Sequence, residues 1–232
     1  MNSNAGQKEV VSPVSPEVQD VVTCTQLPTY GKLHSVKPGQ KAKRKVTKTG
    51  ALFRVRSAPT HRVGIRKLAR EGHLIQMGRG VYRVAAAPLE SHEDLALVAL
   101  RKPEAVVCLL SALRFHELTT ESPGAVWIAV ESHARPPVIE SLRLKVHYLS
   151  GSSFREGIET HVFAGVPVQI YSAAKTVADC FKFRTQIGTK TAVEALKDAW
   201  KKRKVTTNEL YHFARVCRVL NIMRPYLEGV LE

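Results

Sequence analysis

The segment His61–Glu71 has the hydrophobic periodicity of an amphipathic helix. At 100° per residue, Ile65, Leu68 and Ala69 fall within one arc of about 100°, which predicts a buried face. The opposite arc holds four basic side chains, those of Arg62, Arg66, Lys67 and Arg70. Turn and cap residues ending in Thr60 precede the segment, and Gly72 is well placed to end the helix.

Two short β-type segments follow this helix. Leu74–Met77 and Val81–Val84 are joined by Gly78-Arg79-Gly80, which predicts a hairpin with Arg79 at its tip. A short apolar stretch at Gly50–Arg56 precedes the helix. A basic helix followed by a tight turn and a basic-tipped hairpin is the order of a winged helix-turn-helix, which we place at residues 47–87.

The rest of the chain, residues 88–232, alternates between helical and strand patterns. Helices are predicted at Ser91–Arg101, Ala105–Leu118, Ala173–Phe183, Thr189–Lys202, Thr207–Val216 and near Pro225–Leu231. Strands are predicted at Val126–Glu131, Leu142–Leu149, Glu159–Phe163 and Val166–Tyr171. Ser172 is a candidate N-cap, and Thr206 and Glu209 have capping-box spacing. The fold class is therefore α+β: an N-terminal winged helix-turn-helix followed by a larger mixed α/β domain.

Residues 1–46 lack periodic apolar positions and are rich in Pro, Ser, Lys and Gln, so we expect a mostly disordered basic extension. The N-terminus has no apolar region of the kind found in a signal peptide. The longest apolar runs are about half the ~20 residues that cross a bilayer. We therefore expect a cytoplasmic protein with no membrane partner.

Positive charge is concentrated in one part of the chain. The net charge is +15 overall, and it is +8 in residues 47–87, which contain nine basic residues and only one acidic residue, Glu71. Such a segment favours a polyanion partner, because each neutralised phosphate releases condensed counterions. The alternative is a basic surface that only aids solubility. The candidate DNA-binding residues are Thr60, His61, Arg62, Arg66, Lys67, Arg70, Arg79 and Arg83.

No catalytic, cofactor or metal constellation emerges from the sequence. Four scattered cysteines include no C-x-x-C pair, and nine histidines include no H-x-x-x-H pair. Ser172-Ala-Ala-Lys175 matches S-x-x-K, but the S-D-N box that accompanies it in acyl enzymes is missing. Asp179 and Glu194 lie on separate predicted helices and could pair as carboxylates, although a local ion pair explains each more simply.

Roughly residues 47–232 resemble the AbiEi antitoxins of bacterial type IV toxin–antitoxin systems. Leu68–Gly72 with Gly78–Arg83 is similar to that family's winged helix. The more specific matches lie in the C-terminal part: Cys108–His116 with Leu118–Glu121, Val126–Val130, Tyr171–Arg184 with Ile187-Gly188, Glu194–Leu196 and Met223–Leu227.

The resemblance implies two activities. The winged helix would bind inverted repeats in operator DNA at the promoter of its own operon and repress transcription. The C-terminal domain would neutralise a cognate toxin similar to nucleotidyltransferases, with or without a stable complex. By motif, the resemblance implies antitoxin roles for Lys175, Asp179, Lys182, Phe183, Arg184, Arg224 and Tyr226. For Asp179 and Tyr226, a purely structural role is an equal alternative.

Two rival functions stay open. The first is a stand-alone winged-helix repressor whose C-terminal domain senses a ligand or partner. The second is an enzyme acting on nucleic acid, against which the missing metal-ligand motif argues. One departure from the family is that Lys41–Thr49 is basic and poor in apolar residues, where a first helix is expected.

Overall fold

The computed structural model describes residues 51–58 and 61–231. The predicted N-terminal extension (1–46) and the candidate residue Thr60 lie outside the described residues. Within them the chain is a mixed α/β protein, compatible with the predicted α+β class. None of the described helices is both long enough and apolar enough to cross a membrane.

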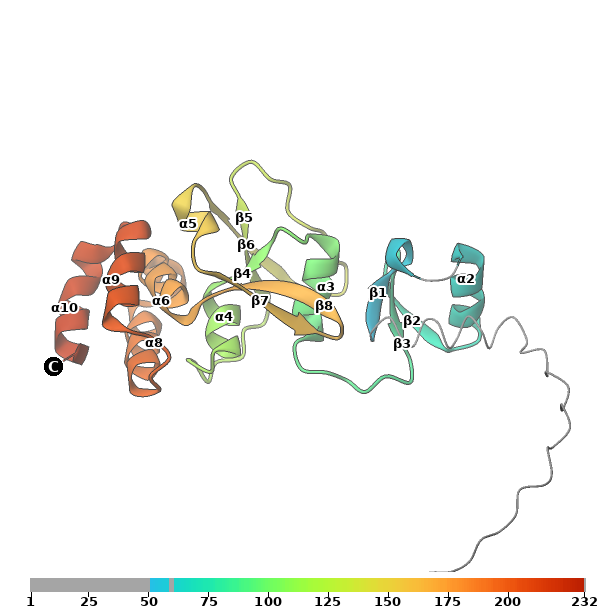
Figure 1. Cartoon of the computed structure of the whole chain (residues 1–232), viewed down its shortest axis with the longest axis horizontal. Helices are drawn as coiled ribbons and strands as arrows, with labels where there is room; N and C mark the ends of the chain where they lie inside the picture. Colours follow the sequence, from blue (N-terminus) through green and yellow to red (C-terminus); the bar gives the residue numbers. More distant parts are fainter. Residues whose placement is uncertain (1–50, 59–60, 232) are drawn as a thin grey trace, which may run out of the picture. The chain divides into compact units, whose positions relative to one another are not determined.

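The described elements follow one another from β1 to α10 (Figure 1). The strands are β1 (Leu52–Arg54), β2 (Leu74–Gly78), β3 (Val81–Val84), β4 (Val106–Val107), β5 (Val126–Glu131), β6 (Leu144–Leu149), β7 (Ile158–Phe163) and β8 (Val166–Tyr171). The helices are the 3-10 helix η1 (Val55–Ser57), α2 (Arg62–Arg70), α3 (Glu93–Arg101), α4 (Leu109–Phe115), α5 (Ser152–Arg155), α6 (Ala173–Lys182), α7 (Arg184–Ile187), α8 (Thr189–Lys201), α9 (Thr207–Val216) and α10 (Leu220–Leu231).

The first sheet has the strand order β1-β3-β2, with both pairings antiparallel. Helix α2 packs on it through Ile65 and Leu68, which share a small core with Phe53 and Tyr82. Gly72 ends the helix as predicted: its φ is +74°, and its N–H donates to the Ala69 carbonyl. A left-handed glycine directly after the last turn satisfies carbonyls that the helix leaves free.

The second sheet has five strands in the order β6-β5-β4-β8-β7. It is mixed, because β5 pairs parallel with β6 and β4 pairs parallel with β8, while the β4–β5 and β7–β8 pairs are antiparallel. Strand residues alternate between its two faces. Val106 and Trp127 belong to one hydrophobic core, and their neighbours Val107 and Ile128 belong to the other.

The core that contains Trp127 is covered by the C-terminal helices, which gather around α6 in Figure 1. Ser172 caps α6 by accepting a hydrogen bond from the Lys175 N–H, and Thr206 and Glu209 form a complete capping box on α9. Both predicted caps are confirmed. They fix where α6 and α9 begin, and therefore which faces of these helices turn inward.

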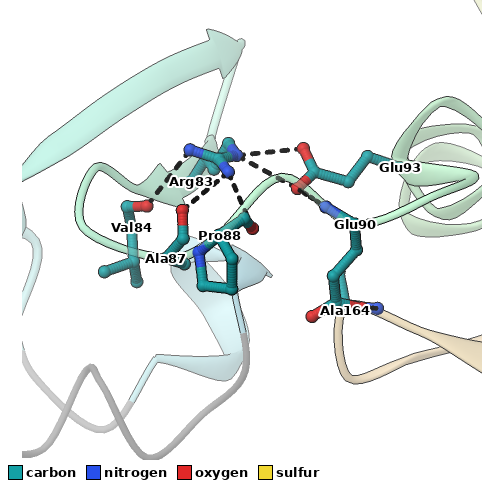
Figure 2. A network of polar contacts seen from close by, with 7 residues as sticks. All are labelled: Arg83, Val84, Ala87, Pro88, Glu90, Glu93 and Ala164. Carbon is teal, nitrogen blue, oxygen red and sulfur yellow. Dashed lines mark hydrogen bonds and ion pairs between the residues drawn. The ribbon is translucent and has the colours of Figure 1, made fainter.

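The core on the other face reaches across the predicted domain boundary at residue 87. Leu52 of β1 and Val81 of β3 are buried in the same cluster as Leu95 and Ala99 of α3. Polar contacts cross the same boundary, because the Arg83 guanidinium donates to Glu93 (Figure 2) and the Leu52 N–H donates to the Ala164 carbonyl at 3.4 Å. The two predicted domains therefore share a packed boundary.

Two predicted helices differ from the structure. The Ala105–Leu118 helix is instead strand β4 followed by the shorter α4, because Val106 and Val107 pair with β5 and β8. The last helix begins at Leu220, five residues before Pro225. Burial of Met223 and Leu227 against the C-terminal core holds that helix together despite the internal proline.

Candidate nucleic-acid interface

A concave basic surface of about 730 Å3 lies beside α2 and the β2–β3 hairpin. It is also lined by Gln76 and Tyr82, and no acidic residue is among the described residues that line it. We call it the arginine groove after its six arginines: Arg54, Arg56, Arg62, Arg66, Arg79 and Arg101. A groove with six guanidinium groups favours a ligand with several phosphates, because each guanidinium can donate two parallel hydrogen bonds to phosphate oxygens.

Helix α2 supplies the centre of this groove. Ile65 and Leu68 are buried, whereas Arg62, Arg66, Lys67 and Arg70 are all exposed, so the predicted division of the helix into two faces is confirmed. Only Arg62 and Arg66 line the groove. Lys67 approaches Glu71 at 3.9 Å on the surface. The exposed His61 directly precedes the first turn of α2.

The other walls come from three separate segments. Arg79 lies exposed in the β2–β3 turn, as predicted. Arg54 and Arg56, at the end of β1 and in η1, were missed by the sequence analysis, although basic residues at alternate positions beside a basic helix are a usable signal. Arg101, the last residue of α3, was also missed. No local pattern marks it, since only the fold brings α3 to the hairpin.

Arg83 is placed differently from its predicted role in DNA contact. Its side chain is only 7% exposed. Its Nε donates to Glu93 Oε2 at 2.9 Å, and its Nη2 donates to the Ala87 and Pro88 carbonyls at 2.9 and 3.0 Å (Figure 2). These acceptors occupy the guanidinium inside the protein, so in this conformation Arg83 holds the connection between β3 and α3.

Lys175 and Asp179 lie one turn apart on α6 and form a buried ion pair. Their side chains are 0% and 1% exposed, and Lys175 Nζ donates to Asp179 Oδ2 at 2.5 Å. The Lys175 ammonium also lies 4.1 Å from the centroid of the Tyr171 ring, within cation–π range. Neither residue can contact a partner protein without rearrangement of α6, so this geometry favours a structural role for the pair.

Burial has the largest effect on the pKa values of the groups around this pair. Burial raises the pKa of the Asp179 carboxyl, and the nearby Lys175 ammonium opposes that shift. The Cys217 thiol donates to Asp179 Oδ1 at 3.2 Å, and burial together with the carboxylate raises its pKa to about 12. Cys217 is therefore a protonated hydrogen-bond donor that links α9 to α6.

The remaining residues that resemblance assigns to antitoxin activity lie closer to the surface. Lys182 and Phe183 are half-buried, and the centroid of the Phe183 ring lies 4.8 Å from that of the His147 ring. Arg184 is half-buried and donates to the Phe181 carbonyl at 3.1 Å. The Tyr226 ring packs 5.4 Å from Phe181. Arg224 is the exposed member of the set and lies on α10.

A second hollow, of about 530 Å3, lies in the C-terminal part between α3, α4 and the start of β5. Its lining mixes Arg114 and Arg143 with Asp94, so it lacks the uniform positive charge of the arginine groove. Among the residues that the structure describes, no group of three or more His, Cys, Asp or Glu side chains could hold a metal ion.

Comparison with models of known protein families finds no match to this chain, and comparison with curated proteins finds no relative.

Proposed function

We propose that this chain is a DNA-binding transcriptional repressor whose C-terminal part is an antitoxin. The observation that supports DNA binding most directly is the arginine groove, formed by the exposed face of α2, the β2–β3 turn, β1 and η1. Its size and its uniform charge suit a duplex backbone better than a single small anion.

The proposed fold of the DNA-binding part is a winged helix. The chain order β1, α2, β2, β3 and the sheet order β1-β3-β2 are those of the second half of such a domain. In this proposal α2 is the recognition helix and the β2–β3 hairpin is the wing. Helix-turn-helix proteins place the recognition helix in the major groove, with its N-terminal residues nearest the base edges.

This docking gives the groove arginines distinct tasks. Arg62 and Arg66 lie on the exposed face of α2, where a guanidinium can donate to guanine O6 and N7. Arg79, at the hairpin turn, reaches the phosphate backbone or the adjacent minor groove. Arg54 and Arg56 extend the backbone contacts, which fix the register of the protein on the duplex.

The test is Arg66→Ala in the full chain. Because Arg66 is exposed in the middle of α2, its loss should weaken binding about 5-fold or more, as expected when a bidentate contact worth about 1–3 kcal/mol is removed. Fluorescence anisotropy with the labelled promoter fragment of its own operon measures the affinity. Arg135→Ala is the control, because Arg135 is exposed in the segment between β5 and β6 and does not line the groove. Equal affinities of the two variants would contradict the proposed docking.

The antitoxin activity rests on the sequence resemblance. The accessible residues that it assigns are Arg224, together with the half-buried Lys182 and Arg184. Co-expression with the product of the adjacent gene, each from its own inducible promoter, tests this activity by growth rescue. A chain with Arg66→Ala should still rescue growth if neutralisation is separate from DNA binding. Persistent toxicity in the presence of soluble, folded chain would contradict the antitoxin proposal.

The second candidate is a repressor that senses a small ligand. The hollow of about 530 Å3 favours it, since its polar and charged lining suits a small polar molecule. This candidate predicts that the chain represses its promoter but does not rescue growth when the neighbouring gene product is toxic. The co-expression experiment therefore separates the two candidates.

A further inference from the structure

Arg101 extends the arginine groove beyond the proposed winged helix. It is the last residue of α3, a helix whose apolar residues Leu95 and Ala99 are buried in the core shared with the five-stranded sheet. Its guanidinium nevertheless lines the same surface as Arg62, Arg66 and Arg79. The C-terminal part of the chain therefore contributes a cation to a surface that is otherwise built from residues 54–82.

The approach of Arg101 depends on Gly78, the last residue of β2. A Cβ atom built on Gly78 would lie 2.7 Å from Arg101 Nη2, which is closer than real Cβ contacts allow. Gly78 therefore leaves room for the guanidinium to lie against the backbone of the hairpin, and a larger residue there would push the flexible end of Arg101 aside.

The guanidinium of Arg101 also has an unused donor. Its Nε is buried and has no hydrogen-bond partner among the residues that the structure describes. A buried cationic donor without an acceptor is costly, and native proteins rarely leave one unpaired. Arg83, on the neighbouring strand, shows the contrast, because Glu93 and backbone carbonyls accept hydrogen bonds from its guanidinium.

The buried Nε is out of a ligand's reach, but Arg101 also lines the groove, where a phosphate oxygen is the acceptor that suits a guanidinium. Arg101 faces a groove with five other arginines, and the described lining contains no carboxylate that could pair with it. One free phosphate ion could occupy only part of a groove of about 730 Å3, whereas successive phosphates of a nucleic-acid strand can meet arginines from α2, the hairpin and α3.

We propose that Arg101 binds a phosphodiester of the DNA backbone and so carries the DNA interface into the C-terminal part of the chain. This inference rests on the proposed DNA-binding function. It assigns Arg101 a backbone contact that fixes the position of the protein on the duplex and is insensitive to base sequence. Base recognition stays with α2.

The experiment measures salt-dependent binding of the full chain to a labelled random-sequence duplex of about 30 base pairs. For Arg101→Gln we expect affinity about 3- to 10-fold lower at moderate salt, and a slope of log affinity against log salt that is smaller in magnitude by about 1. Arg135→Gln removes the same charge from an exposed site outside the groove and should change neither quantity.

Arg101→Lys keeps the positive charge but lacks the Nε donor and the planar fork. It should therefore keep the wild-type slope with affinity lowered about 2- to 3-fold, and it provides the test if Arg101→Gln fails to fold. Thermal unfolding of each variant shows whether the fold is intact. A structural role for Arg101 would lower the melting temperature and leave the salt slope unchanged, which would overturn the proposal.

Failure of this inference is distinguishable from failure of the proposed function. If the wild-type chain binds the duplex and Arg66→Ala weakens binding, while both Arg101 variants match Arg135→Gln, then DNA binding stands and the role of Arg101 is refuted. If the wild-type chain does not bind duplex DNA even at low salt, the proposed DNA-binding function and this inference fall together.

Discussion

Arg79, Arg83 and Arg101 have the same side chain in three different environments. Arg79 is exposed at the hairpin turn, Arg83 is buried and donates from all three guanidinium nitrogens, and Arg101 is half-buried with an unpaired Nε. What each arginine can do follows from the acceptors around it. An occupied guanidinium stabilises the fold, whereas a free one is available to an anion.

The Arg83–Glu93 pair should matter for stability. Arg83→Met leaves the Glu93 carboxylate, whose side chain is 15% exposed, without its cation, and we expect unfolding to become easier by about 3 kcal/mol. Urea denaturation of the full chain measures the change. Arg155→Met is the matched control, since Arg155 pairs with Glu131 at 3.0 Å on the surface and should cost less than about 1 kcal/mol. Equal losses in the two variants would show that Arg83 is not anchored as described.

Sequence reasoning succeeds for residues whose environment is set locally. The exposure of Arg62 and Arg66 follows from the helical period alone, because Ile65 and Leu68 must face the sheet. The burial of Arg83 could not be predicted in this way. Its partner Glu93 belongs to another element, ten residues further along the chain. Whether Arg101 lines the groove likewise depends on how α3 lies against the hairpin.

At the scale of single elements, α6 is the most completely buried helix of the C-terminal part, with residues 173–181 all buried. Its only charged residues in that stretch, Lys175 and Asp179, neutralise each other, and Cys217, directly after α9, donates to the same carboxylate. The helix thus encloses a polar cluster within an otherwise apolar core. Such a cluster is costly to break from one side.

Removing one charge of the Lys175–Asp179 pair should lower the free energy of unfolding more than replacing both residues by apolar ones. Lys175→Met leaves a buried carboxyl without its cation and should destabilise the chain by about 3–5 kcal/mol. The double variant Lys175→Met/Asp179→Leu removes both charges and should recover most of that loss. Denaturant unfolding of the two single variants and the double variant completes the cycle. If the chain has the proposed antitoxin activity and the stable double variant keeps it, the pair acts through the fold. If it has lost neutralisation, the resemblance has assigned these residues a direct role correctly.

Elements with a clear period are predicted almost to the residue. Strands β5 and β8 and helix α9 have the predicted bounds, since alternation and capping are local signals. Strand β4 was predicted as part of a helix, because two valines within an apolar run fit a buried helix as well as a buried strand. Only pairing with β5 and β8, which are distant in sequence, decides between them.

At the scale of the whole molecule, acid should destabilise the chain through two histidines, the buried His147 and the half-buried His116. Burial lowers the pKa of both His116 and His147 from its usual value near 6.5. The folded state then binds fewer protons than the unfolded state at mildly acidic pH. Stability is therefore complete above about pH 6.5 and falls as the pH drops from there toward the lowered pKa values.

His147→Phe tests this dependence, because a phenyl ring can keep the stacking on Trp127 that the imidazole makes at 5.2 Å. The variant should lose less stability than the wild type between pH 7.5 and 5.5, as measured by urea unfolding at each pH. Above pH 7.5 the two curves should run parallel. A variant curve as steep as that of the wild type below pH 6.5 would exclude His147 as a source of the acid sensitivity.

The boundary between β3 and α3 also bears on how such a protein can evolve and be engineered. A chimaera that moves residues 51–87 onto another effector would carry Arg83 away from Glu93, and Leu52 and Val81 away from the core that encloses them. The transplanted module would then hold an unneutralised cation and an uncovered apolar patch. If the chain binds DNA as proposed, exchange of its specificity by recombination should succeed only where the crossover lies beyond α3. Changes of the proposed operator should then arise mainly by point substitutions on the exposed face of α2.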